Sequence, residues 1–185
     1  MLREIPLTKA HRLLAPRPVC LVTARYKGRV NAMPAAWVGP ISLEPPLLAL
    51  AIHPSHYTHD LLARGEECVL CLPGRPLAEL VVKLGSVSGA NVDKVVTCGL
   101  RLVDAQRVEP PRIEGCLAYL ECAMVERLSP GDHTLFIAQI AGAWAEEEAF
   151  GETWLLPEGN EELAPLVHLG GSEFCLPGKR WTVSA

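Results

Sequence analysis

Several features common in membrane, secreted and nucleic-acid-binding proteins are missing from this sequence of 185 residues. Its longest apolar run, Leu47–Ile52, is far shorter than the ~20 residues that cross a bilayer as a helix. The first residues, Met1–Pro6, lack the apolar core of a secretory signal. The 17 basic and 21 acidic residues give a net charge of −4 and form no basic cluster. We therefore expect a cytoplasmic protein that binds neither membranes nor nucleic acid.

The common nucleotide and nucleophile motifs are missing too. The chain contains neither the G-x-G-x-x-G of dinucleotide-binding folds nor the G-x-x-x-x-G-K-[ST] of P-loop proteins. Gly85–Gly89 has the glycine spacing of a nucleophile elbow, but its central residue is Val87, where that chemistry requires a serine. The sequence therefore predicts no covalent nucleophile.

Cysteine and histidine are present, but their spacing predicts neither a disulfide framework nor a metal site. The seven cysteines are an odd number, and without an export signal we expect free, buried thiols. Cys68 and Cys71 form a lone C-x-x-C, whose side chains point to opposite faces of a strand. His53, His56 and His59 recur every third residue, but an expected strand-to-helix junction spreads them apart.

The chain is rich in short apolar runs that are separated by turn residues. It has 16 prolines and 15 glycines, and this punctuation favours β structure over a helix bundle. Lys27–Gly28 and Ser129–Asp132 are the predicted turns of two hairpins. The expected extended segments are 19–38 (the first hairpin), 47–52, 68–72, 115–125 and 133–144.

These segments predict a mainly β fold for one domain over residues 1–185. The expected architecture is a small antiparallel, Greek-key-like barrel of about six strands, because closing the sheet removes exposed edges. Several strands are apolar on both faces, and a small barrel has few ways to cover both, so we also expect a homodimer.

A few short helices are expected outside this barrel. Thr8 and Asn91 are possible helix caps, and Ser55 is a candidate cap for a helix that closes at Gly65. The clearest pattern is Pro76–Leu84, with proline at the first position and Gly85 after the last. The expected helices cover 7–14, 55–65, 76–84 and 91–96.

Four segments carry polar, small or aromatic residues that packing alone does not require. The strand Asn31–Trp37 offers amide groups and room for a flat ring, although an edge strand beside a turn has the same composition. His53–Thr58 places hydroxyls and free N–H groups at a helix N-terminus, which binds anions or is simply capped. Gly85–Lys94 is either a ligand-wrapping loop with a cation or a plain surface loop. Gly131–Thr134 places His133 at the start of a long strand, where it is either functional or incidental to the turn.

Taken in order along the chain, these segments resemble the flavin reductase-like family, whose members have an FMN-binding split β-barrel. The resemblance covers about residues 10–180, and its ending is similar to the flavoredoxin branch. The motifs that carry it are PRPVCLVT (16–23), GRVNAMP (28–34), PPL (45–47), YTHDL (57–61), GSVSG (85–89), VDK (92–94), GDHTLF (131–136) and PLVHLGG (165–171).

The resemblance implies a homodimer that binds FMN near the subunit interface. It implies that Asn31–Trp37 lies along the isoalloxazine ring, that Ser55–Thr58 holds the ribityl chain and phosphate, and that Ser88 and Lys94 close over the cofactor. His133 matches the family histidine near the flavin, where nicotinamide stacks, and is the expected catalytic residue. The implied cofactor-binding residues are Asn31, Ala32, Met33, Pro34, Ala35, Ala36, Trp37, Ser55, His56, Tyr57, Thr58, Ser88 and Lys94.

Two positions differ from the commoner family pattern. Ala36 stands where many relatives have a hydroxyl residue, so one hydrogen bond to the flavin is missing from the implied site. His56 stands where some relatives have arginine, which implies weaker or pH-dependent phosphate binding.

The implied activity is that of an NAD(P)H-dependent flavin reductase that passes electrons through FMN to free flavin or another acceptor. Two alternatives stay open: a flavoredoxin-like FMN electron-transfer protein that works with a partner protein, and a non-enzymatic FMN-binding module. The sequence does not identify the electron acceptor, distinguish NADH from NADPH, or show whether FMN stays tightly bound.

Overall fold

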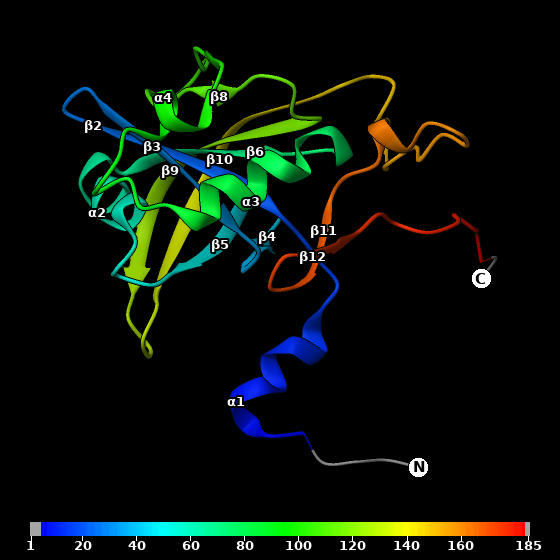
Figure 1. Ribbon diagram of the computed structural model, residues 1–185, viewed down its shortest axis with the longest axis horizontal. Coiled ribbons are helices and arrows are strands. Elements are labelled where there is room, and N and C mark those ends of the chain that lie inside the picture. The colour runs from blue at the N-terminus through cyan, green and yellow to red at the C-terminus, as the bar shows by residue number, and fades with distance from the viewer. Residues whose placement is uncertain (1–4, 184–185) are drawn as a thin grey trace.

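The computed structural model of the protein describes residues 5–183 and consists mainly of antiparallel strands (Figure 1). Seven of them form one sheet in the order β3-β2-β6-β9-β10-β5-β4, and every neighbouring pair is antiparallel. The strands are β2 (Cys20–Tyr26), β3 (Arg29–Ala35), β4 (Val38–Ser42), β5 (Leu47–Ile52), β6 (Glu67–Leu72), β9 (Ala118–Leu128) and β10 (Thr134–Ala145).

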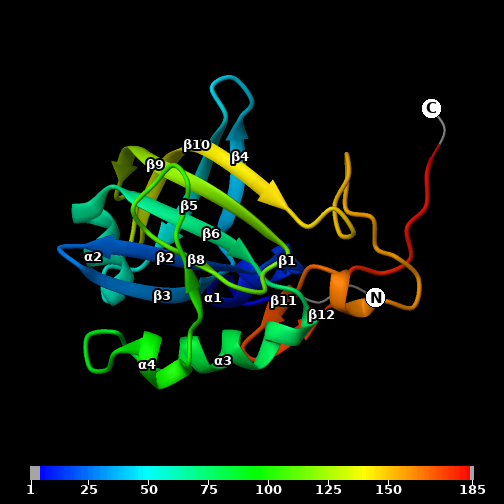
Figure 2. The same ribbon diagram turned by 90° about the horizontal axis from the view of Figure 1, so that it is seen from above.

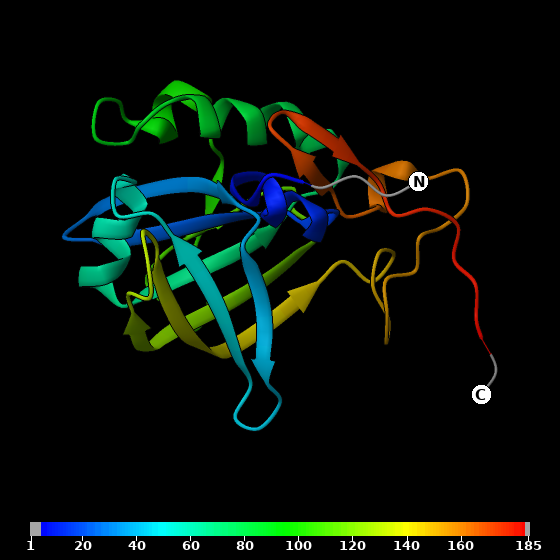
Figure 3. The same cartoon turned by 90° about the horizontal axis from the view of Figure 1, so that it is seen from below.

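The sheet curls into a barrel because its two edge strands are consecutive in the chain. β3 leads through Ala36 and Trp37 directly into β4 at the opposite edge, and the Trp37 carbonyl accepts a hydrogen bond from Ala51 N–H (3.0 Å). The β4–β5 hairpin projects from one side of this barrel (Figure 3). The predicted antiparallel β fold is confirmed, with one strand more than expected: β3 ends at Ala35, and β4 is a separate strand that begins at Val38, where the predicted hairpin ends.

The inward side chains of these strands form the first of two apolar layers. Val22, Leu50, Leu70 and Phe136 are almost fully buried inside the barrel. Helix α2 (Tyr57–Gly65) adds Leu61 and Leu62 to the same layer and lies at one end of the barrel (Figure 3). Burying side chains of this size stabilises the fold by ~2 kcal/mol each.

The second apolar layer lies outside the sheet, under α3 (Ala78–Ser86) and α4 (Lys94–Cys98). Val81 and Leu84 of α3 pack against Leu21 and Val69, and α3 and α4 follow one side of the barrel (Figure 2). Cys68 belongs to the inner layer and Cys71 to the outer layer, as their spacing predicts. All seven thiols are free, and six of them are buried.

The remaining elements are short. A hairpin of β11 and β12 pairs with β1 to make a second, small sheet, which the sequence analysis does not anticipate. These elements are α1 (Leu7–Ala10), the 3₁₀ helix η1 (His11–Leu14), β1 (Arg17–Pro18), η2 (Arg75–Leu77), β7 (Leu102–Val103), β8 (Arg112–Ile113), η3 (Glu161–Leu163), β11 (Val167–Gly170) and β12 (Glu173–Cys175).

Three predicted helix caps are wrong. α1 begins after Pro6 rather than at Thr8, and α2 begins after His56 with no side-chain cap. Ser55 instead has its hydroxyl 2.8 Å from His53 Nδ1, so it is not available to cap the helix. Asp93, and not Asn91, caps α4, because its carboxylate Oδ1 accepts from the N–H groups of the first turn (2.8 and 3.3 Å).

Helix α3 also differs from the predicted Pro76–Leu84. Its first turn is the 3₁₀ helix η2, and the α-helix continues through Gly85 to Ser86. Strand β3 passes close to Gly85, since a Cβ at this position would be 3.2 Å from Pro34 Cγ. This close contact favours a glycine at this position of the helix. Within residues 5–183, no helix combines the length and the apolar character needed to cross a bilayer.

Candidate functional site

Eight of the predicted cofactor-binding residues line one polar cavity of about 270 Å³. The cavity lies where the edge strand β3, the N-terminal end of α2 and the segment between α3 and α4 meet. The eight residues are Asn31, Met33, Ser55, His56, Tyr57, Thr58, Ser88 and Lys94. The fold therefore brings together three of the four segments that the sequence analysis selected.

The base of this cavity is a buried hydrogen bond between two of its elements. Asn31 Nδ2 of β3 donates to Thr58 Oγ1 of α2 (2.7 Å), and both side chains are almost fully buried. Buried polar groups are tolerated only when they are paired, so this bond fixes the first turn of α2 against the strand. Gly89 packs onto the same pair: a Cβ there would be 2.1 Å from Asn31 Oδ1.

Lys94 is a structural cation as well as a cavity residue. Its side chain is buried, and Nζ donates to the carbonyls of Ala32 (3.0 Å) and Leu84 (2.7 Å). Burial lowers the pKa of Lys94 from its ordinary value, because the charged form loses hydration. The Lys94 side chain thus connects β3 to α3, and its hydrogen bond satisfies the carbonyl of the buried residue Ala32.

His56 lines the cavity at the start of α2, and His53 lies next to it. His53 Nδ1 accepts a hydrogen bond from the backbone N–H of Ser55 (3.2 Å), and the His53 and His56 rings lie 6.3 Å apart at their centroids. The pKa of His56 is lowered, mainly by burial and then by the nearby positive charges of His53, Lys94 and His133. An anion bound next to His56 would instead raise the pKa of this imidazole.

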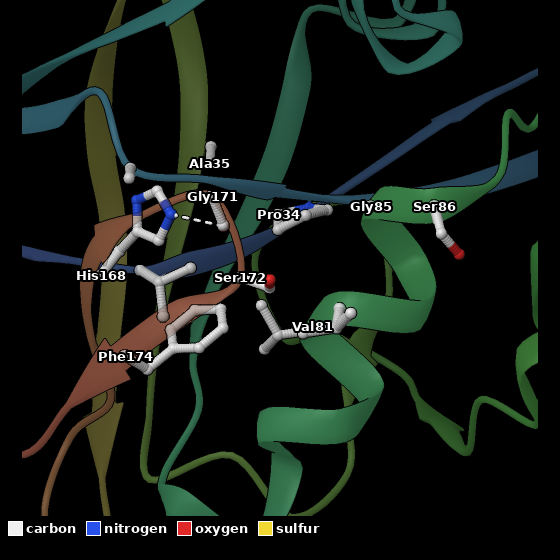
Figure 4. A pocket seen from close by; sticks show the side chains of 12 residues that line it. Pro34, Ala35, Val81, Gly85, Ser86, His168, Gly171, Ser172 and Phe174 are labelled. Atoms are coloured by element: carbon white, nitrogen blue, oxygen red, sulfur yellow. Dashed lines mark hydrogen bonds between the residues drawn. The ribbon is translucent and has the colours of Figure 1, made fainter.

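A second cavity, of about 400 Å³, lies along β3 next to the first (Figure 4 shows the residues that line the second cavity). The two share Gly85 and Ser86 of α3. The predicted ring-binding residues Pro34, Ala35 and Ala36 form one wall of the second cavity. Its other walls are mostly apolar and come from α3 and the β11–β12 hairpin, including Val81, Val82 and Phe174.

His168 supplies a polar group at the hairpin side of the second cavity. Its Nε2 lies 3.0 Å from the carbonyl of Gly171 (Figure 4), and because a carbonyl only accepts, Nε2 carries the proton. Nδ1 is buried and has no hydrogen-bond partner in the described part of the chain.

Three predicted residues line neither cavity. Ala32 is fully buried in the outer apolar layer. Trp37 and His133 lie together after the end of β3, where both line a separate cavity. Their ring centroids are 4.7 Å apart and the planes are tilted by 32°. His133 Nδ1 is 2.7 Å from Asp132 Oδ1, and the ring centroids of His133 and His53 are 5.3 Å apart, with the two planes nearly perpendicular. His133 therefore has Trp37, Asp132 and His53 as neighbours.

Gly85 and Ser86, which line both cavities, belong to the selected segment 85–94 but were not named as cofactor-binding residues. The sequence analysis did not select His168, Ser172 and Phe174 of the β11–β12 hairpin, which line the second cavity. The motif PLVHLGG at 165–171 carries part of the family resemblance, and it was the available signal for the hairpin. Nothing in its local pattern places it against β3, because that contact depends on the packing of distant segments.

The structure is an antiparallel split barrel, with a polar and an apolar cavity side by side along its edge strand β3. Residues 12–173 match the sequence model of the flavin reductase like domain. The chain belongs to the flavin reductase-like family, as its motifs indicate.

The curated relatives include proteins from bacteria and archaea. The chain is 33% identical over 190 aligned positions to the uncharacterized protein YddH of Escherichia coli, covering 98% of this chain and 99% of YddH. It is 32% identical to the uncharacterized protein PYRAB12460 of Pyrococcus abyssi, covering 90% and 93% of the two chains. An uncharacterized protein of Archaeoglobus fulgidus is 43% identical over 110 residues, and there the chain covers 62% of the relative.

Solved structures agree with the fold. An FMN-binding protein from Thermus thermophilus, solved with bound 1-cyclohex-2-enone, superposes with a TM-score of 0.83 at 27% identity, covering 100% of this chain and 98% of that one. Flavoredoxin from Methanosarcina acetivorans superposes with a TM-score of 0.83 at 25% identity, covering 99% and 96%.

Proposed function

We propose that the protein is an FMN-binding oxidoreductase of the flavin reductase type. The observation that carries this proposal is the pair of joined cavities along β3, one polar and one apolar. FMN has the same division, with a ribityl phosphate at one end and a flat ring system at the other. The family membership and the FMN-binding relative from Thermus thermophilus support the same assignment.

The polar cavity is suited to the phosphate and ribityl chain. Hydroxyl groups of Thr58 and Ser88, the imidazole of His56 and the N-terminal end of α2 all lie around it. A helix N-terminus attracts anions through its dipole and its free N–H groups. Tyr57 and Ser55 complete the wall.

The apolar cavity is suited to the ring system. Pro34, Ala35 and Ala36 carry small side chains, so a planar group can approach the backbone of the strand closely. Lys94 stabilises this wall from behind by holding Ala32 against α3. When bound there, FMN supplies the two-electron chemistry, and the protein supplies position and electrostatics.

His133 is the proposed catalytic residue on the side from which NAD(P)H approaches. Asp132 and Trp37 restrict its ring, and a fixed ring can hold the nicotinamide of NAD(P)H in a reactive orientation. In this proposal the electrons pass to free flavin or to another acceptor.

We also propose that the protein is a homodimer. The outward side chains of β5, Leu47, Ala49 and Ala51, are only half-buried in the single chain. Nearby, Trp37 and Ile41 are 40% and 52% exposed. A second copy would cover this apolar face, because soluble proteins seldom expose contiguous apolar patches.

A flavoredoxin-like electron carrier is the second candidate function. The superposition with flavoredoxin from Methanosarcina acetivorans over 99% of the chain favours it. Such a protein would exchange electrons with a partner protein rather than with NAD(P)H. A non-enzymatic FMN-binding module is the third candidate.

The visible spectrum of the purified protein, recorded before and after anaerobic NADH or NADPH, tests the proposal. We expect a yellow protein that is bleached by one of the two donors faster than free FMN in a stopped-flow measurement. A yellow protein that is bleached no faster than free FMN would favour the flavoredoxin-like function. A colourless protein that ignores added FMN in calorimetry would rule out all three candidates.

The substitution His133→Ala is expected to slow reduction by the preferred nucleotide about tenfold, because the nicotinamide loses its positioning contact. FMN affinity should stay within about threefold, since the polar cavity is unchanged. His11→Ala is the matched control: His11 also contacts Trp37, with ring centroids 5.7 Å apart, but it belongs to the 3₁₀ helix η1. Equal reduction rates in both variants would remove the proposed role of His133.

FMN affinity is expected to rise as the pH falls from 8 towards 6. The lowered pKa of His56 keeps its imidazole neutral in the free protein, whereas a bound phosphate favours the protonated form. Binding then takes up a proton, which increases the association constant by up to about tenfold per pH unit. Riboflavin, which lacks the phosphate, should show a flat profile, and His56→Gln should flatten the profile for FMN. A steep profile for riboflavin would refute this explanation.

A further inference from the structure

The first residue of β10 is held by a side chain of helix α2. His59 Nε2 of α2 lies 2.8 Å from Thr134 Oγ1, and because a hydroxyl both donates and accepts, the two groups form a hydrogen bond in either tautomer of the imidazole. Thr134 is buried, and the His59 ring makes a T-shaped contact with Phe136, with centroids 5.2 Å apart. The proposed function leaves this bond between α2 and β10 without a role.

Thr134 lies where an exposed turn becomes an anchored strand. Residues 129–132 of the turn are exposed, His133 is half-buried, and Thr134 is buried. The pairing of β10 with β9 begins only at Leu135. On its other side, β10 begins to pair with β5 at Thr134, which faces Ile52. His133 is therefore the last residue of the turn, and the position next to it is fixed both by a strand and by the side chain of His59.

The pairing of β5 with β10 also explains why two histidines meet at this point. In antiparallel strands, the residues that flank a facing pair also face each other. Thr134 faces Ile52, so the residues just outside this pair, His53 and His133, come together with ring centroids 5.3 Å apart. The chain then continues from β5 into α2, and the hydrogen bond of His59 connects this helix back to the same pair of strands.

The same turn of α2 is also fixed to the polar cavity along β3. Thr58, the neighbour of His59, accepts the buried hydrogen bond from Asn31 Nδ2 of β3 (2.7 Å). Consecutive residues of one helix are thus bonded to β3 and to β10, two strands that are not neighbours in the sheet. Helix α2 therefore sets the position of the start of β10 relative to the cavity at Asn31.

We propose that His59 is a positioning residue, which acts through Thr134 to fix the backbone of His133 for the transfer of hydride from the nucleotide. His59 itself lines neither of the two cavities along β3. A displacement of ~1 Å in a positioning group is enough to slow a reaction strongly, so loosening the residue next to His133 should be felt in the rate. This inference rests on the proposed function, because it requires His133 to hold the nicotinamide.

Hydrogen exchange of the flavin-free protein, followed by mass spectrometry, tests the anchoring itself. Thr134→Val keeps the shape of the side chain but removes its hydroxyl, and His59→Leu removes the imidazole. Each should speed the exchange of the amides of residues 129–135 about fivefold, because the turn opens more readily without its anchor. Asp60→Asn is the matched control, since Asp60 is the exposed neighbour of His59 on α2 and accepts a hydrogen bond from Arg64 (2.8 Å). Exchange that is the same in all three variants would overturn the inference.

Anaerobic reduction of the FMN-loaded protein tests the consequence for the reaction. With NADH or NADPH, whichever reduces the parent protein faster, His59→Leu and Thr134→Val should each slow the reduction about fivefold and leave FMN affinity within about twofold. Reduction by dithionite, which needs no nucleotide site, should keep its rate. His59→Gln should restore most of the nucleotide-dependent rate, because an amide can also bond the Thr134 hydroxyl. Slower reduction by dithionite would show a general loss of structure and would also overturn the inference.

The substitution His133→Ala separates this inference from the proposed function. In the His133→Ala background, His59→Leu should have no further effect on reduction by the nucleotide, because the residue that it positions is gone. If His133→Ala slows the reduction but neither His59→Leu nor Thr134→Val does, then the inference is wrong and the proposed role of His133 stands. If His133→Ala has no effect, then the proposed role of His133 is wrong and the inference is wrong with it.

Discussion

Gly89→Ala is expected to abolish tight FMN binding while the barrel stays folded. A Cβ at this position would lie 2.1 Å from Asn31 Oδ1 and 2.8 Å from Tyr57 Cδ1, distances that no side chain tolerates. The Asn31 side chain cannot move away from the added Cβ without breaking its buried hydrogen bond to Thr58. We expect FMN affinity to fall about 100-fold, which corresponds to ~2.7 kcal/mol, because both the wall and the base of the polar cavity shift.

Calorimetric titration of the variant with FMN measures this loss. Gly178→Ala is a suitable control, since a Cβ there would meet nothing within 4 Å. Circular dichroism should show the same β spectrum for both variants. Wild-type affinity in Gly89→Ala would mean that the cofactor does not use the cavity beneath Asn31.

Lys94→Met is expected to destabilise the fold, because Lys94 is a buried donor to two carbonyls. Methionine fits the space but leaves the carbonyls of Ala32 and Leu84 without their buried donor. An unsatisfied buried polar group costs ~1–3 kcal/mol, and we expect the free energy of unfolding to fall by about 2 kcal/mol. Urea denaturation followed by fluorescence measures the change.

Lys83→Met provides the comparison for this prediction. Lys83 lies on α3 near Leu84, but its side chain is exposed. Its replacement should change stability by no more than about 0.5 kcal/mol. If both variants unfold at the same urea concentration, then the two hydrogen bonds of Lys94 contribute nothing measurable to the fold.

The strands could be predicted from the sequence because their signals are local. Leu47–Ile52 has the bounds of β5, and Lys27–Gly28 is the turn between β2 and β3, where Lys27 and Gly28 both have positive φ (47° and 76°). Alternation of side chains along a strand and the conformational freedom of turn residues are properties of neighbouring residues. The long hairpin of β9 and β10 was predicted for the same reason.

The caps and the cavities were harder to predict because they depend on tertiary contacts. Ser55 has the right chemistry for a cap, but His53 engages its hydroxyl. Lys94 reads as a loop cation in the sequence, whereas the fold buries it between β3 and α3. The strands β11 and β12 are too short to show a periodic pattern in the sequence. The part that this hairpin plays in lining the apolar cavity could therefore not be predicted.

Strand β3 lies at an edge of the sheet, which affects how the ligand-free chain interacts with other copies of itself. An unpaired strand edge normally invites intermolecular β-pairing, and from there fibrous aggregates. Here Pro34 has no N–H to offer an incoming strand, and Lys94 already occupies the carbonyl of Ala32. Pairing between the β3 edges of two newly made chains is thereby disfavoured even when the cavities along β3 are empty.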